Sequence, residues 1–240
     1  MLTALLTGGS AGIGRAIAAV LLASGYRVVS LDQAAATLEH EHLHTLEVDL
    51  LSAAATHDAA LVAAERWRPT ILVHNAGAIR PALLPNVNRV DLDALVSLHL
   101  GAAITLVQAT LPAMREDKWG RVVLISSRAA LGLASRTSYS ATKAGMIGMA
   151  RTWALELGPV GVTVNVIAPG PVEATDQFHS ILPEGDPRIA QMAGTIPVRR
   201  LGTPADVARA VLFFVDPDAG FVTGQTLFVC GGTSIGSLQI

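Results

Sequence analysis

The stretch Thr7-Gly8-Gly9-Ser10-Ala11-Gly12-Ile13-Gly14 separates an apolar run at residues 2–6 from a helix-like segment at residues 13–22. Glycines at such a turn let the backbone bend tightly and approach a ligand closely. The following helix would present free N–H groups and the positive end of its dipole, both of which favour a pyrophosphate. The turn therefore predicts a first strand–turn–helix unit that binds a nucleotide, with contacts from Gly8, Ser10, Ala11, Gly12, Ile13 and Gly14.

Short apolar runs continue to alternate with helix-like segments along the whole chain. Expected strands lie at residues 2–6, 28–31, 46–48, 71–73, 122–125, 162–167 and 227–229. Expected helices lie at residues 13–22, 53–66, 92–111, 138–157 and 205–215. This alternation is typical of a single doubly wound α/β domain, with a mostly parallel sheet covered by helices on both faces. We expect one domain over residues 1–240, with a substrate-loop insertion at about 171–202, where prolines and glycines interrupt the alternation.

Charge and composition exclude several classes of protein. A formal net charge of −2 argues against nucleic acid or an anionic membrane surface as a partner. Residues 94–114 lack Asp, Glu, Lys and Arg, but we expect them to form a helix buried between the sheet and a partner subunit rather than a membrane span. The His-rich run at residues 39–44 predicts a solvated turn and no metal site. The single cysteine, Cys230, and the absence of a signal-peptide pattern fit a cytoplasmic protein.

An acidic residue ends the second expected strand. Asp32 stands where a carboxylate can accept hydrogen bonds from a ribose 2′-hydroxyl and would repel a 2′-phosphate. Positions 11 and 33, next to the turn and to Asp32, hold Ala and Gln rather than a Lys or Arg that could bind such a phosphate. The pattern favours NAD as the cofactor.

A tyrosine and a lysine stand one helical turn apart at Tyr139 and Lys143. An ammonium beside a phenol would lower the pKa of the phenol and make Tyr139 a plausible acid and base toward a carbonyl oxygen. Ser127 follows an apolar strand and could hold that oxygen through its hydroxyl, with Ser126 as the rival residue.

Several motifs, in order along nearly the whole chain, resemble those of the short-chain dehydrogenase/reductase family, in its compact single-domain branch. The motifs are Thr7–Gly14, His74-Asn75-Ala76-Gly77, Ile125-Ser126-Ser127, Tyr139 with Lys143, Ala168-Pro169-Gly170, Gly224-Gln225 and Gly231-Gly232. The closing segment resembles the subgroup of 3-oxoacyl-carrier-protein reductases.

The resemblance implies a seven-stranded sheet in the order 3-2-1-4-5-6-7 and a site at the carboxyl edge of its strands. It implies that Tyr139 is the general acid/base, that Lys143 binds the nicotinamide ribose and that Ser127 orients the substrate. Contacts with the adenine half of the cofactor are implied for Asp49, Leu50, Asn75, Ala76 and Gly77. Contacts with the nicotinamide are implied for Pro169, Gly170 and Val172.

This sequence departs from the family pattern at four places. His99 stands in the long helix where the family has an Asn that holds a proton-relay water, so we consider His99 either a relay member or a buried neutral histidine. His74 stands where a first Asn is common, and Cys230 where an Asp often precedes Gly-Gly. Ala174 replaces the family's Thr, and Thr175 comes one residue later.

The expected activity is hydride transfer between NAD(H) and a secondary alcohol or ketone, by a homotetramer. A 3-oxoacyl thioester is the alternative substrate. A catalytically silent NAD-sensing regulatory protein is a second alternative, and a sugar-nucleotide epimerase or dehydratase on a related fold is a third.

Overall fold

The computed structural model describes residues 1–173, 176–179 and 182–235. Seven parallel strands form one sheet in the order β3-β2-β1-β4-β5-β6-β7, as expected from the sequence. The strands are β1 (Thr3–Thr7), β2 (Arg27–Asp32), β3 (Leu43–Glu47), β4 (Ile71–His74), β5 (Gly120–Ile125), β6 (Val162–Pro169) and β7 (Thr226–Val229). β3 begins earlier than predicted, because the end of the His-rich run joins the sheet through pairing of Leu43 with Val28.

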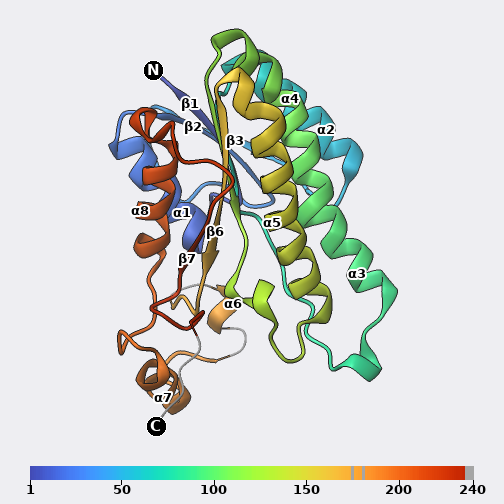
Figure 1. Cartoon of the computed structure of the whole chain (residues 1–240), viewed down its shortest axis with the longest axis vertical. Coiled ribbons are helices and arrows are strands. Elements are labelled where there is room, and N and C mark those ends of the chain that lie inside the picture. Colours follow the sequence, from blue (N-terminus) through green and yellow to red (C-terminus); the bar gives the residue numbers. More distant parts are fainter. Residues whose placement is uncertain (174–175, 180–181, 236–240) are drawn as a thin grey trace.

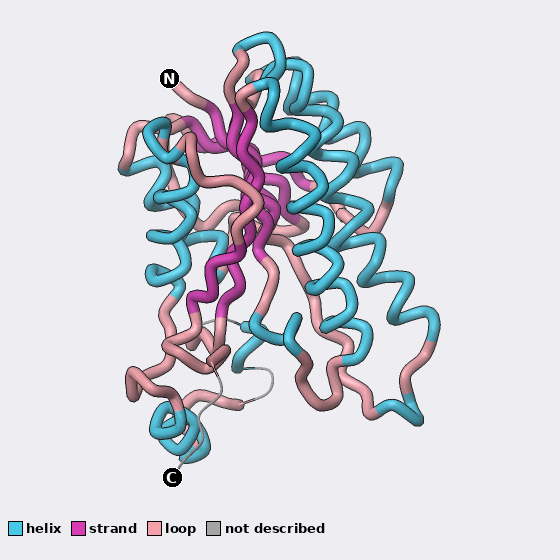
Figure 2. Tube along the Cα trace, in the orientation of Figure 1, coloured by secondary structure: helices cyan, strands magenta, loops and turns pink. Residues whose placement is uncertain are grey.

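The central strands are apolar on both faces because helices cover both (Figures 1 and 2). Leu5 of β1 packs in the core beneath α2, α4 and α5, whereas Leu6 packs in the core beneath α1 and α8. Both leucines are fully buried. The covering helices are α1 (Gly12–Ala23), α2 (Ala53–Trp67), α4 (Ala102–Asp117), α5 (Thr137–Leu157) and α8 (Pro204–Val215).

The long helical segment before β5 is not one regular α-helix. It consists of α3 (Arg89–Val96), a π-helical turn η2 (Ser97–Gly101) and α4, where the sequence predicted a continuous helix over residues 92–111. By length and composition alone, Arg89–Asp117 could cross a membrane, a criterion that core helices of globular proteins also meet. Here Leu106 and Met114 are fully buried, and these apolar side chains of α4 pack in the core against the sheet.

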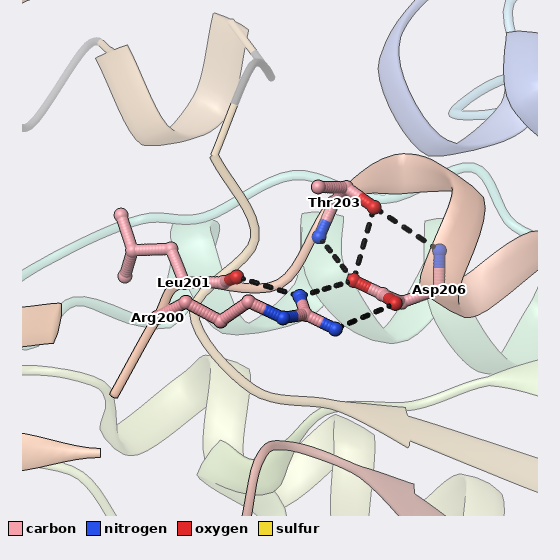
Figure 3. Close-up of polar contacts among 4 residues, drawn as sticks. All are labelled: Arg200, Leu201, Thr203 and Asp206. Carbon is pink, nitrogen blue, oxygen red and sulfur yellow. Dashed lines mark hydrogen bonds and ion pairs between the residues drawn. The ribbon is translucent and has the colours of Figure 1, made fainter. Parts of the chain in front are cut away.

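The described parts of the expected insertion, residues 171–173, 176–179 and 182–202, extend beyond the carboxyl edge of the sheet (Figure 1). They include the short helices α6 (Asp176–His179) and α7 (Pro187–Thr195). The segment leads into α8, where the Thr203 hydroxyl accepts a hydrogen bond from the Asp206 N–H and the Asp206 carboxylate accepts one from the Thr203 N–H. Arg200 forms an ion pair with the same carboxylate (Figure 3). These contacts anchor the carboxyl-terminal end of the segment.

Candidate active site

The glycine turn lies at the carboxyl end of β1 and lines one end of a large cavity. A Cβ on Gly14 would lie 1.7 Å from the Gly8 carbonyl oxygen, so only glycine fits there. The Asn75 amide holds the same carbonyl from the end of β4 with a hydrogen bond of 3.1 Å. The turn therefore keeps its backbone close to β4 and leaves the start of α1 open toward the cavity.

The cavity has a volume of about 800 Å³ and brings together residues from four strand ends. It is lined by most of the residues that the sequence singled out: Gly8, Ala11, Gly12, Ile13, Gly14, Asn75, Ala76, Gly77, Ser127, Tyr139, Lys143, Pro169, Gly170 and Val172. Ser10, Asp32, Asp49, Leu50 and His99 are not among its described lining residues. Leu50 belongs to the core, while the exposed Asp49 carboxylate accepts hydrogen bonds from Gln33 and from the Leu51 N–H.

Asp32 contacts the glycine turn directly. One of its carboxylate oxygens accepts a hydrogen bond of 2.9 Å from the Ser10 N–H, and the other accepts one of 3.2 Å from the Ala34 N–H. These bonds hold a negative charge beside the turn, at the end of β2. The neighbouring positions, Ala11 and Gln33, carry no cation.

Tyr139 and Ser127 form the polar pair of the cavity. The two side chains share a hydrogen bond, and the Ser127 hydroxyl also accepts one of 3.1 Å from the Ala129 N–H. The hydroxyl of Ser126 instead donates to the Lys143 carbonyl oxygen at 2.7 Å. The geometry therefore favours Ser127 over Ser126 as the residue that contacts a substrate oxygen.

The protonation of Tyr139 differs from the expectation. Burial raises the pKa of the Tyr139 phenol, while the hydrogen bond with Ser127 and the charge of Arg136 oppose that rise. Lys143 is 2% exposed, and burial lowers the pKa of its ammonium to about 7. Its Nζ donates to the Ile125 carbonyl oxygen at 2.8 Å and lies 5.6 Å from the centre of the Tyr139 ring. Lys143 is therefore not found to bring the pKa of the phenol toward neutrality, because burial raises the pKa of Tyr139 and lowers that of Lys143.

His99 is fully buried in the π-helical turn, behind Tyr139. Its Nε2 accepts a hydrogen bond of 3.3 Å from the Ala78 N–H, so its Nδ1 carries the proton and donates to the Thr142 hydroxyl at 2.8 Å. That hydroxyl donates onward to backbone carbonyls of α5. Burial and the nearby Lys143 hold the pKa of His99 far below its usual range. The residue is a neutral, fully hydrogen-bonded imidazole whose ring lies edge-on to Tyr139 at 5.7 Å.

His74, which departs from the family pattern, has a structural role that was not predicted from the sequence. Its Nε2–H donates to the Leu98 carbonyl oxygen, so its Nδ1 accepts from the Thr7 hydroxyl, and both distances are 3.1 Å. The same hydroxyl accepts hydrogen bonds from the N–H groups of Asn75 and Ala76. A histidine at the end of a buried strand was the signal available. Ala174 and Thr175 lie outside the described residues, so their position relative to the nicotinamide site stays a prediction.

Comparisons with known proteins place this geometry in a family. A family model described as enoyl-(acyl carrier protein) reductase matches residues 8–234. The chain belongs to the short-chain dehydrogenase/reductase family. It is an oxidoreductase of the subgroup that contains 3-oxoacyl-carrier-protein reductases.

Three relatives show the range of similarity. The BbsD subunit of (2S)-[(R)-hydroxy(phenyl)methyl]succinyl-CoA dehydrogenase from Thauera aromatica is 44% identical over 168 residues, covering 70% of this chain and 66% of BbsD, slightly less than two thirds. The BbsC subunit is 38% identical and covers 96% of this chain and 94% of BbsC. The 3-oxoacyl-[acyl-carrier-protein] reductase MabA of Mycobacterium tuberculosis is 35% identical, covering 97% of this chain and 92% of MabA.

A solved structure agrees with the fold. A putative NAD(P)-dependent gluconate 5-dehydrogenase from Beutenbergia cavernae, with bound NADP at low occupancy, superposes with a TM-score of 0.87. It is 30% identical and the match covers 96% of both chains.

The described residues fit a nicotinamide dinucleotide. The glycine turn keeps its compact shape because any side chain at Gly14 would clash with the Gly8 carbonyl, and it leads to Asn75, Ala76 and Gly77, which also line the cavity. At the other end, a Cβ on Gly170 would lie 2.8 Å from the Cys230 Cα, so Gly170 allows β6 and the chain after β7 to meet closely. The turn would hold the pyrophosphate, and Pro169, Gly170 and Val172 would border the nicotinamide.

Proposed function

We propose that this protein transfers a hydride between NAD(H) and a secondary alcohol or ketone, and that 3-oxoacyl and 3-hydroxyacyl thioesters are its substrate class. The observation that carries this proposal is the Ser127–Tyr139 pair in a cavity that continues to the glycine turn. The names of BbsD, BbsC and MabA support thioesters, because each describes a CoA or acyl-carrier-protein substrate.

The proton chemistry follows from the two hydroxyl groups. The bound cofactor supplies or accepts the hydride. During reduction, Tyr139 donates its proton to the substrate oxygen, and its raised pKa keeps the phenol protonated and ready to donate at neutral pH. Ser127 donates a hydrogen bond to the same oxygen and stabilises the charge that develops on it.

Lys143 has a positioning role in this proposal. Its Nζ now donates to the Ile125 carbonyl oxygen inside the cavity wall. Ribose hydroxyls would give the ammonium further acceptors and restore its charge, so we expect Lys143 to bind the nicotinamide ribose.

Asp32 supports NAD rather than NADP. A 2′-phosphate beside this carboxylate would meet a fixed negative charge with no cation at Ala11 or Gln33. Bound NADP in the Beutenbergia cavernae protein shows that this fold also accepts the phosphorylated cofactor, so the choice rests on residues of this chain.

The test is steady-state reduction of acetoacetyl-CoA with NADH and with NADPH. We expect kcat/KM to be at least about tenfold higher with NADH, which corresponds to about 1.4 kcal/mol. Asp32→Ser should reduce the difference in kcat/KM between NADH and NADPH, because the carboxylate that repels the 2′-phosphate is removed. Equal use of both cofactors by the wild-type protein would contradict the assignment of NAD. Tight NADH binding without turnover of any ketone in a broad panel would instead support a silent NAD-binding protein.

A further inference from the structure

The cavity is electrically one-sided. Among its described lining residues are three cationic side chains, Arg128, Arg136 and Lys143, and no Asp or Glu. Lys143 is enclosed and donates to the Ile125 carbonyl oxygen. The two arginines therefore determine the charge that a substrate meets in the rest of the cavity.

Arg128 follows Ser127 directly, at the start of the 3-10 turn η3 (Arg128–Leu131). The side chain is partly buried, and its Nη1 donates to the Thr233 carbonyl oxygen at 3.3 Å. A guanidinium has five N–H donors in a rigid fork, so this contact leaves most of its hydrogen-bonding capacity for another group. Thr233 also lines the cavity, so this contact holds the Arg128 guanidinium beside the segment that follows β7.

Arg136 is the N-cap residue of α5, one turn before Tyr139. Its Nη1 donates to the carbonyl oxygen and the hydroxyl of Ser135, at 3.2 Å and 2.8 Å. Its positive charge acts on the Tyr139 phenol, where it lowers the pKa against the effect of burial. No side chain caps this end of α5, so the positive end of the helix dipole adds to the charge of Arg136.

Several arginines of the described chain form ion pairs with carboxylates. Arg68 pairs with Glu116 and Asp117, and Arg200 pairs with Asp206 (Figure 3). Within the described residues, Arg128 and Arg136 form no ion pair with an Asp or Glu. Two partly buried guanidinium groups in a cavity whose described lining holds no Asp or Glu favour an anionic group on the ligand.

We propose that the acyl part of the substrate carries a second carboxylate, which Arg136 binds beside the reacting carbonyl, with Arg128 contributing a second guanidinium from the start of η3. This inference rests on the proposed function and refines its substrate class to thioesters of dicarboxylic acids. Apolar lining residues, among them Ile79, Leu133 and Met192, would contact the carbon chain of the acyl group.

The phosphates of coenzyme A are another source of negative charge. We place the carboxylate at Arg136 because this arginine acts on Tyr139 and stands one helical turn from it. The carrier phosphates lie at the far end of the pantetheine arm, away from the carbonyl that Tyr139 protonates. Thioesters of N-acetylcysteamine lack phosphates and separate the two sources.

The experiment compares 3-oxoadipyl-N-acetylcysteamine with its methyl ester, using NADH as the reductant. The readout is the ratio of kcat/KM for the acid over the ester, so that changes common to both substrates cancel. We expect a ratio of at least about ten for the wild-type protein, and a fall of at least about fivefold in Arg136→Gln, with a smaller fall in Arg128→Gln. Arg115→Gln, an exposed position on α4 outside the cavity, is the matched control and should keep both rates.

A wild-type ratio near one, or a ratio unchanged in both arginine variants, would overturn the proposal. The proposal would also be overturned if the arginine substitutions lowered kcat/KM only for coenzyme A thioesters. The arginines would then bind the phosphates of the carrier. If neither substrate turns over, the proposed reaction fails; the substrate-class inference is then judged by calorimetric titration of both compounds into the protein–NADH complex. Preference for the acid that is lost in Arg136→Gln would still support the carboxylate site, and equal binding of both compounds would refute it.

Discussion

Replacing Lys143 by methionine should remove a specific pH dependence of stability. Lys143 is 2% exposed, and burial lowers its pKa from 10.5 to about 7. Between these two values the unfolded chain binds more protons than the folded protein, so the free energy of unfolding rises with pH. One pKa unit corresponds to about 1.36 kcal/mol. Allowing for partial titration near pH 7.5, the gain between pH 7.5 and pH 9.5 should be about 2 kcal/mol.

The assay is urea unfolding of the cofactor-free protein at several pH values between 7.5 and 9.5, for the wild type and Lys143→Met. Methionine keeps the length of the side chain and cannot titrate. The substitution removes the hydrogen bond to the Ile125 carbonyl oxygen, which should lower the free energy of unfolding by the same amount at every pH. The dependence of that free energy on pH should not change for this reason. Contributions of Tyr26, Tyr139 and Cys230 are common to both proteins and cancel in the difference.

We expect the wild type to gain about 2 kcal/mol relative to Lys143→Met across this range. Parallel stability curves would show that Lys143 keeps an ordinary pKa when folded, and the argument from its burial would then be wrong. The same result would revive the expectation that Lys143 lowers the pKa of Tyr139 before any cofactor binds.

Three other predictions follow from the geometry. Tyr139→Phe should reduce turnover by about 10²–10⁴-fold while leaving the NADH dissociation constant, measured by fluorescence, nearly unchanged, because one proton donor is lost; a variant that keeps a tenth of the rate would exclude this role. His99→Leu should lower the free energy of unfolding by about 1–3 kcal/mol, because the Ala78 N–H loses its acceptor, yet leave the shape of the pH–rate profile unchanged; loss of a limb near neutral pH would instead assign His99 to a proton relay. The protein should be a homotetramer that covers the exposed Ile104 and Leu155 of α4 and α5, and a monomer by light scattering at micromolar concentration would contradict this.

The fold was predictable because its signals are local. The glycine turn, the two-sided apolar strands and the alternation with helices depend on neighbouring residues, and they specify a parallel sheet without knowledge of distant contacts. The π-helical turn at residues 97–101 was not predictable in this way. Its apolar residues fit a regular helix equally well, and the Leu98 carbonyl oxygen there accepts a hydrogen bond from His74, 24 residues earlier in the chain.

The pKa shifts in the candidate site were less predictable than the identity of the residues that form it. Spacing alone placed Tyr139 and Lys143 on one helical turn, and the structure puts both in the cavity. Their pKa shifts depend on how completely the surrounding chain excludes water, which spacing does not report. The same applies to Arg136, because an arginine before a helix is commonly solvated and its sequence context does not place it in the cavity.

The two unusual histidines belong to one local arrangement. His74 donates to the Leu98 carbonyl oxygen and accepts from the Thr7 hydroxyl, so it ties the end of β4 both to the glycine turn and to the π-helical turn. His99, one residue after Leu98, accepts from the Ala78 N–H and so holds the loop that follows β4. Each ring is neutral, because each uses one nitrogen as donor and the other as acceptor, and because burial disfavours the charged form. Protonation of either ring would convert its accepting nitrogen into a donor, so the hydrogen bond to that nitrogen would be lost. It would also place a positive charge near Lys143. The pair therefore stabilises the wall of the cavity that contains Asn75, Ala76 and Gly77 without adding a titrating group to the site.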